Sequence, residues 1–431
     1  MQKTFNTRTL DNIKVNLLAL PNSNYFKMEI VSHYGSNVER VYEKITGKNV
    51  YGISHLIEHL SFKTSKDFTT QELMDVPRNE GYHNASTTYD YIDYFFETTA
   101  QNMDLAIKYC FNVAYNDLTK VTEKEFETEK NVVLNEIRRY DDDEQAIFYF
   151  NTFQAAAGLC EEDNVLGIAK TVATFSLQEA ITMKKVLLTS PRMSYNISYD
   201  PTKTTEAEII QKVLEQKKRF QVESGETLFS HADYTSLLKQ PRHNVFIRPS
   251  GSGQAMNVIF IPLDCDIITG EIVMRYIESL ADQTSLNEII REKHGLTYGV
   301  DAYIDTFGNK CFMCINCDVD KNAQEQFLSL FEESIALSVD NFNQTKYASL
   351  SKIIRLRRVL SSLNLKKYES LFLIDKNDYR ALEPYYKILK SDVDLAYEAM
   401  YKACSFKVFS EQLKLLKRRI NDNAYSRVSS V

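Results

Sequence analysis

The sequence predicts an α+β protein of two similar domains, each a mainly antiparallel sheet packed with helices. Its 431 residues exceed what one hydrophobic core usually organises, so two domains of about 200 residues are expected. Hydrophobic residues make up 44% and charged residues 25%, which is typical of a folded globular chain. The two halves carry predicted strands and helices in similar order, which suggests an internal structural repeat.

Residues 1–217 are expected to form the first domain. The pattern of polar and apolar residues predicts its elements in this order: strands at 13–21 and 26–33, helices at 51–62 and 69–76, strands at 83–90 and 92–100, helices at 101–116, 122–140 and 178–188, a strand at 192–199 and a helix at 205–217. Thr69 or Thr70 is expected to cap the second helix. Pro77 is expected to end it, because proline lacks the N–H that continues helical hydrogen bonding.

A polar stretch at 218–243 is the predicted linker, and residues 244–431 are expected to form the second domain. Its predicted elements are a strand at 255–262, a helix at 269–293, strands at 297–304 and 310–318, and helices at 321–338 and 343–359. Cys311, Cys314 and Cys317 lie on one of these strands, where residues three apart point to opposite faces. We therefore interpret them as buried thiols and not as a metal site.

Charge and hydropathy exclude two classes of partner. The formal net charge of −7 and the pI near 5.7 argue against a broad basic face that binds nucleic acid. No segment approaches the roughly 18 consecutive apolar residues of a membrane span, and the N-terminal residues lack the apolar core of a signal peptide. Without a secretory signal, the cysteines are best explained as reduced thiols. We expect a soluble cytoplasmic protein with no nucleic-acid or membrane partner.

The segment His55-Leu-Ile-Glu58-His59 lies within the predicted helix at 51–62. Residues four apart share one face of a helix, so His55 and His59 are placed to present two imidazoles to one zinc ion. Glu58 lies beside them, where a carboxylate can remove a proton from water as it attacks a peptide carbonyl. The order of the residues is that of the inverted zinc-protease motif.

A catalytic zinc site takes three protein ligands, so a third is expected downstream. The charged helix at 122–140 offers several carboxylates, most of which are expected to form a solvated face. Glu129 and Glu136 lie two helical turns apart and share one face. From the helical spacing, either of them is a candidate for the third ligand.

With the residues Gly-Ser-Asn-Val-Glu-Arg that precede this motif, the chain resembles the pitrilysin/insulinase-type zinc peptidases, particularly the short two-domain branch that includes the mitochondrial processing peptidases. In that family the third ligand is a glutamate with another glutamate seven positions before it. Positions 60–135 separate His59 from Glu136, which matches the family's spacing. The resemblance implies Glu136 as the third zinc ligand and Glu129 as a residue that orients a histidine.

The resemblance also implies residues that contact the substrate. Asn84 and Ala85 match the family's Asn-Ala-x-Thr strand, an edge to which an extended peptide adds by backbone hydrogen bonds. Arg291 and Tyr298 match a pair that the C-terminal domain contributes to a facing zinc site. An arginine can hold the substrate backbone or a carboxylate, and a tyrosine hydroxyl can donate to a carbonyl oxygen as negative charge develops there.

The expected function is a zinc-dependent endopeptidase that cleaves extended or unfolded peptides inside a chamber between two chains. Because the metal motif and the Arg291–Tyr298 pair are both intact, a homodimer with shared sites is expected. Two alternatives stay open: a non-catalytic scaffold or partner subunit of a peptidase complex, and a maturation protease with one narrow protein substrate.

Overall fold

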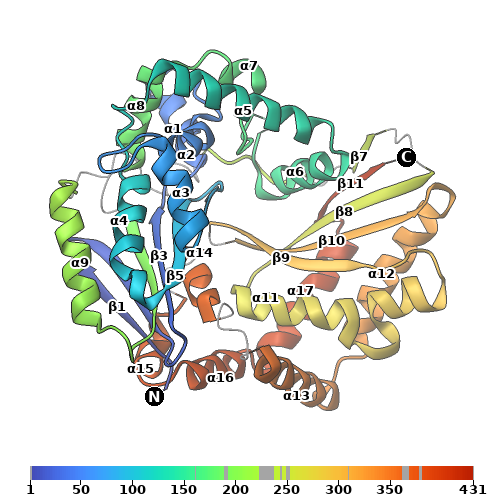
Figure 1. The fold of residues 1–431 in the computed structure, drawn as a ribbon. Helices are drawn as coiled ribbons and strands as arrows, with labels where there is room; N and C mark the ends of the chain where they lie inside the picture. Colours follow the sequence, from blue (N-terminus) through green and yellow to red (C-terminus); the bar gives the residue numbers. More distant parts are fainter. Residues whose placement is uncertain are drawn as a thin grey trace. The chain divides into compact units, whose positions relative to one another are not determined.

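The computed structural model describes residues 2–160, 162–188, 193–222, 237–242, 245–248, 253–308, 310–361, 368–377 and 381–430. It confirms the α+β fold, with two mainly antiparallel sheets that are each packed with helices (Figure 1). Most of the predicted linker at 218–243 lies outside the described residues. No helix in the described ranges is both long and apolar enough to cross a membrane.

The first sheet has the order β1-β2-β6-β3-β5-β4 among the described strands. They are β1 (Thr4–Leu10), β2 (Ile13–Ala19), β3 (Tyr25–Ser32), β4 (Tyr82–Thr87), β5 (Ile92–Thr99) and β6 (Met193–Tyr199). The sequence patterns predicted all of these except β1. Helices α1 (Asn37–Thr46), α2 (Ile53–Ser61), α3 (Thr70–Glu80), α4 (Met103–Ala114), α5 (Glu123–Asp141), α7 (Ala169–Val172), α8 (Leu177–Leu187) and α9 (Glu206–Arg219) accompany this sheet.

The second sheet repeats five strands of the first. Its order is β7-β11-β8-β10-β9, with β7 (Val245–Arg248), β8 (Gln254–Leu263), β9 (Asp301–Phe307), β10 (Lys310–Asp320) and β11 (Ser426–Ser430). In each sheet the first and last of these five strands in the chain pair in parallel, β2 with β6 and β7 with β11, and the other pairs are antiparallel. The same connectivity in both halves is the internal repeat that the order of the predicted elements suggested.

The chain divides into two compact units, and each takes one segment from the other half of the sequence. The first unit includes residues 365–396 and the second includes residues 140–161, whereas the predicted boundaries place these segments in the opposite domains. Helix α6 (Glu144–Ala157) packs on β8 and β11 of the second sheet. Helix α14 (Ser370–Asn377) bonds to the first sheet through Asp375 and Lys376. The two helices occupy equivalent places in the repeat, so each half of the sequence contributes the corresponding helix to the other unit.

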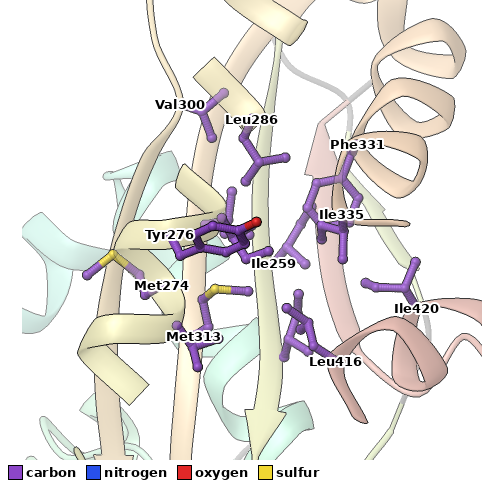
Figure 2. Close-up of a cluster of buried hydrophobic side chains, with 14 of the residues drawn as sticks. Ile259, Met274, Tyr276, Leu286, Val300, Met313, Phe331, Ile335, Leu416 and Ile420 are labelled. Carbon is purple, nitrogen blue, oxygen red and sulfur yellow. The ribbon is translucent and has the colours of Figure 1, made fainter. Parts of the chain in front are cut away.

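The remaining described helices are α11 (Ile267–Arg275), α12 (Gln324–Asp340), α13 (Gln344–Ser361), α15 (Tyr386–Leu389), α16 (Val393–Ala403) and α17 (Phe406–Asn421). The core of the second unit lies between the sheet and α11, α12 and α17, as Figure 2 shows for Tyr276, Phe331 and Leu416. Cys311 and Cys317 belong to this buried cluster, while Cys314 is buried outside it. The three cysteines are therefore buried free thiols, as their spacing on a strand predicted.

Two predicted helices have different limits. Thr69 caps α3 in a capping box, but the helix continues past Pro77 to Glu80. The carbonyl of Leu73, four residues before the proline, instead accepts a hydrogen bond of 3.0 Å from the Tyr109 hydroxyl. This tertiary contact satisfies the group that the missing N–H would have bonded.

The long helix predicted at 269–293 is interrupted. After α11 the chain forms a π-helical turn at Tyr276–Leu280 and a second π-helical segment at Asn287–Lys293. Asp282 between them has a φ of 54°, which a continuous right-handed helix does not contain. The strand predicted at 297–304 is Asp301–Phe307, so Tyr298 lies in the loop before it.

Candidate metal centre

Helix α2 places the motif because its apolar residues fix it against the core of the first unit. Ile53, Leu56, Ile57 and Leu60 are all fully buried. These four residues lie on the helix face that packs into the protein. His55 is itself only 7% exposed, so its ring is held within the packed structure and not in solvent.

His55, His59 and Glu136 converge. The Oε2 atom of Glu136 lies 3.7 Å from His55 Nε2 and 3.5 Å from His59 Nε2, and one donor atom from each residue lies within 4.8 Å of the others. The two histidines come from α2 and the glutamate from α5, so the structure brings the residues of the motif together with the distant helix.

Glu129 lies one layer behind this cluster. Its Oε2 atom is 3.3 Å from His59 Nδ1, and its Oε1 atom is 2.5 Å from the Lys63 ammonium. Although burial opposes the shift, the hydrogen bond from His59 and the Lys63 ammonium lower the pKa of Glu129. An ionised Glu129 that accepts the Nδ1 proton leaves Nε2 of His59 free to face Glu136.

The two histidines have opposite electrostatic environments. Burial and the neighbouring His59 lower the pKa of His55 to about 4, so its imidazole is neutral at neutral pH. Burial also lowers the pKa of His59, but hydrogen bonds with Glu129 and Glu136 outweigh it and raise the value to about 9. Hydrogen bonding to His59 is the main cause of the lowered pKa of Glu136.

Glu58 faces the edge strand β4. Its Oε2 atom accepts a hydrogen bond of 2.7 Å from the Thr87 hydroxyl. Burial raises the pKa of Glu58, while the bond from Thr87 and the charge of His59 oppose this. A carboxyl group with a raised pKa accepts a proton more readily near neutral pH, which suits a general base.

The donor set fits a zinc ion. Two imidazole nitrogens and one carboxylate oxygen are an established ligand set of catalytic zinc sites, and a tetrahedral ion with bonds of about 2.0–2.1 Å separates its ligand atoms by about 3.4 Å. The distances of 3.5 and 3.7 Å between Glu136 and the two histidines agree with that separation. In the described part of the chain, the buried Nδ1 atom of His55 has no hydrogen-bond partner.

The expected substrate strand is β4, the last strand of the first sheet. Among the described residues it pairs only with β5, so its other backbone edge carries no strand. Asn84 is exposed and Ala85 is half-buried on this strand. The polar groups of an unpaired strand edge can bond an added strand.

Arg291 and Tyr298 belong to the second unit. Both line a cavity of about 560 Å³ in that unit, together with Asn287, Gln254 and Asp318. The Arg291 guanidinium lies 5.4 Å from the centre of the Tyr298 ring, and Tyr298 is 93% exposed. The exposed phenol is therefore available to a group outside the second unit.

A buried lysine lies behind the motif helix. Lys184 on α8 is 1% exposed, and its ammonium donates to Ser61 Oγ at 2.8 Å and to the Tyr94 hydroxyl at 3.4 Å. Burial lowers the pKa of Lys184 to about 7, although the charges of Asp117 and Glu58 oppose the shift.

Lys184→Met is expected to raise the free energy of unfolding at pH 7 by about 1–3 kcal/mol. The unfolded lysine keeps a pKa near 10.4, so between about pH 7 and 10 the unfolded state binds more protons and wild-type stability rises with pH. Methionine removes both the buried charge and this slope, while Ser61 and Tyr94 still bond each other at 3.1 Å. Urea unfolding at pH 7 and pH 9.5 measures both effects.

Lys185→Met, at the exposed neighbouring position, is the matched control and is expected to keep the wild-type pH slope. A Lys184→Met protein less stable than wild type at pH 7 would show that the two hydroxyl contacts outweigh the cost of burying the ammonium.

Sequence reasoning assigned no role to Lys63, to Lys184 or to Thr87, the threonine of the Asn-Ala-x-Thr strand. Lys63 follows His59 by one helical turn, and this spacing could have placed it near the same partner. Thr87 lies three residues after Asn84 on a strand, where alternation gives its side chain the opposite face, toward α2. Lys184 is joined to the motif only by tertiary packing, and no local pattern marks it.

Comparisons of sequence match parts of the chain to known proteins. Residues 41–165, which include His55, Glu58, His59 and Glu136, match the family described as Insulinase (Peptidase family M16). A stretch of 107 residues is 36% identical to the zinc protease PqqE of Helicobacter pylori and covers 24% of each chain. A stretch of 181 residues is 25% identical to an uncharacterized zinc protease of Rickettsia bellii and covers 41% of each chain. The chain thus matches less than half the length of these relatives.

Solved structures share the fold over nearly the whole chain. A protease from Helicobacter pylori aligns over 100% of both chains with a TM-score of 0.70 at 15% identity. A peptidase M16 inactive domain from Pseudomonas fluorescens aligns over 99% of this chain and 97% of its own with a TM-score of 0.74 at 13% identity. Likeness at such low identity establishes the fold and leaves the activity to the residues of the site.

Proposed function

We propose that the protein is a zinc-dependent endopeptidase of the inverted-motif class, and the match of residues 41–165 to the insulinase family of peptidases supports this proposal. The observation that carries the proposal is the convergence of His55 Nε2 and His59 Nε2 on the Glu136 carboxylate, with Glu58 alongside. These residues would hold the ion, and the name zinc protease given to the sequence relatives supports the choice of metal.

A bound zinc ion supplies Lewis acidity, which activates water and polarises a peptide carbonyl. Glu58 takes the proton of the attacking water, and its hydrogen bond from Thr87 fixes the carboxylate in position. The same carboxyl group then returns the proton to the leaving amine. Glu129 keeps the proton of His59 on Nδ1 throughout, through the contact of 3.3 Å.

We propose that the substrate is an extended or unfolded peptide. The edge of β4 that pairs with no other described strand supports this, because an added strand would bond its backbone beside Asn84 and Ala85. Arg291 would hold the substrate backbone or a carboxylate, and the exposed Tyr298 hydroxyl would donate to the carbonyl oxygen as charge develops. Folded proteins lack free strands of this kind, so they are expected to resist cleavage.

Removal of the metal tests the proposal directly. The purified protein is expected to contain about one zinc ion per chain and to cleave a denatured protein until a chelator strips the ion. Zinc added back after removal of the chelator is expected to restore cleavage. Elemental analysis measures the metal, and gel electrophoresis of the denatured substrate measures cleavage. A metal-free protein that cleaves equally well would contradict the zinc mechanism.

We propose further that the protein is a homodimer in which each site joins the first unit of one chain to Arg291 and Tyr298 of the other. An equimolar mixture of Glu58→Gln and Arg291→Ala chains is the test. Half of the randomly formed dimers are mixed and carry one intact site out of two, so about one quarter of wild-type activity is expected.

The matched control mixes Glu58→Gln with His59→Ala, which places both defects in the same unit and should restore nothing. Differently tagged chains establish that subunits have exchanged. If exchange is complete and the first mixture stays inactive, sites are not shared between chains.

A non-catalytic scaffold is the second candidate, because a peptidase M16 inactive domain from Pseudomonas fluorescens has the same fold. A preparation that binds no zinc and cleaves no denatured protein would support this candidate. A maturation protease with one narrow protein substrate shares the same chemistry. Cleavage of a peptide library separates it from a general endopeptidase, because a narrow enzyme cuts few members.

We also propose a cytoplasmic location, supported by seven cysteines that are all free thiols.

A further inference from the structure

The metal-binding helix α2 begins without a capping side chain of its own. Its N-cap residue is Gly52, which offers no side-chain acceptor. The carboxylate of Glu39 on α1 takes this place: its Oε2 atom accepts from the Gly52 N–H and its Oε1 atom from the Ser54 N–H, both at 2.8 Å. A remote glutamate thus satisfies two backbone donors that a helix start leaves unpaired.

Glu39 is held rigidly in this position. Glu39 is only 1% exposed, and each of its two carboxyl oxygens accepts a hydrogen bond. Burial raises the pKa of Glu39 to about 8, and the two N–H donors oppose this rise. The positive end of the helix dipole also favours the ionised form. The geometry favours the ionised form over the effect of burial, because each of the two oxygens accepts one N–H, whereas a protonated carboxyl group would carry a hydrogen on one of them.

The same turn is fixed from a second side by a contact between two glycines. Gly52 and Gly167 have φ angles of 94° and 81°, and their Cα atoms lie against each other without intervening side chains. A Cβ atom added to Gly167 would lie 2.4 Å from the Gly52 Cα atom, and one added to Gly52 would lie 2.6 Å from Gly167 Cα. The backbone at the start of α2 therefore has no room to move toward Gly167.

The two zinc-binding histidines differ in how they are oriented. His59 is held by Glu129 through its Nδ1 atom, whereas the buried Nδ1 of His55 has no hydrogen-bond partner among the described residues. The Ser54 N–H that bonds Glu39 belongs to the Ile53–Ser54 peptide group, one peptide group before His55, so the bond fixes the first turn of α2 from which the His55 side chain extends.

We propose that Glu39 is a positioning residue for the metal centre, which sets the first turn of α2 so that His55 presents Nε2 to the ion. The inference rests on the proposed zinc-dependent function. Glu129 orients His59 through a hydrogen bond to its ring, whereas Glu39 orients His55 through hydrogen bonds to the backbone before it. Gly167 restrains the same turn through its close contact with Gly52.

The test compares Glu39→Gln with Glu43→Gln in the full chain. Glutamine at position 39 can accept only one of the two N–H groups and turns an N–H of its own toward the other. Glu43 lies on the same helix and bonds the Tyr51 hydroxyl at 2.7 Å, so its substitution is the matched control. The readouts are zinc affinity by competition with a coloured chelator, the visible absorption of the cobalt-substituted protein, and thermal unfolding without metal.

Glu39→Gln is expected to lower zinc affinity by about tenfold or more and to change the cobalt spectrum, while Glu43→Gln keeps both. If Glu39→Gln lowers only the unfolding temperature and keeps wild-type affinity and spectrum, Glu39 is merely structural and the inference is wrong. A wild-type protein that binds no zinc contradicts the proposed function itself. If Glu39→Gln does not fold, Gly167→Ala displaces the same turn from the other side and is expected to change the cobalt spectrum.

Discussion

Glu58→Gln is expected to lower kcat/KM for cleavage of a denatured protein by about a thousandfold while zinc content stays at the wild-type level. Glutamine has nearly the same shape and can still accept the hydrogen bond that Thr87 donates at 2.7 Å. It cannot accept the proton of the attacking water, so only the base is removed. Initial rates with a fluorescent denatured substrate, beside elemental analysis of the same preparation, measure the two quantities together.

Two further variants calibrate this result. Glu123→Gln changes an exposed glutamate at the start of α5 and is expected to leave kcat/KM unchanged. Thr87→Val removes the bond to the base and keeps the base itself, so a smaller loss of about tenfold is expected. Activity above a tenth of wild type in Glu58→Gln would exclude Glu58 as the base, and a loss of zinc would place it among the ligands.

The sequence predicts those residues of the site whose spacing along a single helix places them on one face. His55, Glu58 and His59 lie within one helical turn and a fraction, so the helix alone places them together. The same spacing rule puts Glu129 and Glu136 on one face of α5, but it does not say which of them reaches the histidines. The structure separates their positions: Glu136 faces both Nε2 atoms and Glu129 faces the Nδ1 of His59.

The parts that the sequence does not predict depend on contacts between distant segments. Glu39 bonds the start of α2 across a loop, and its place in a charged helix gives no indication of a buried acceptor. Helix α14 lies far along the chain in the second half, yet it packs with the first sheet. Periodicity locates such helices but not their partners, because an amphipathic face does not specify which sheet covers it.

Lys376→Met is expected to lower the free energy of unfolding by about 3–5 kcal/mol, a large part of the total stability of an ordinary domain. The Lys376 ammonium on α14 lies 2.7 Å from Asp93 and 3.2 Å from Glu29, and both acids are buried in the first sheet. Without the cation, two neighbouring carboxylates remain in a poorly solvated place. Denaturant unfolding measures the loss, and Lys212→Met, in an exposed pair with Asp104, is the control expected to show no measurable change.

The pH dependence of this variant separates charge compensation from simple packing. When Lys376 is replaced by Met, the unpaired acids Glu29 and Asp93 raise each other's pKa above the unfolded values. The folded state then binds the additional proton, so the stability that Lys376→Met loses at pH 7 is partly regained as pH falls toward 5. Adding Glu29→Gln and Asp93→Asn to Lys376→Met should recover stability at pH 7 and remove this slope. A loss that is equal at both pH values would instead come from the buried methylene chain of the lysine.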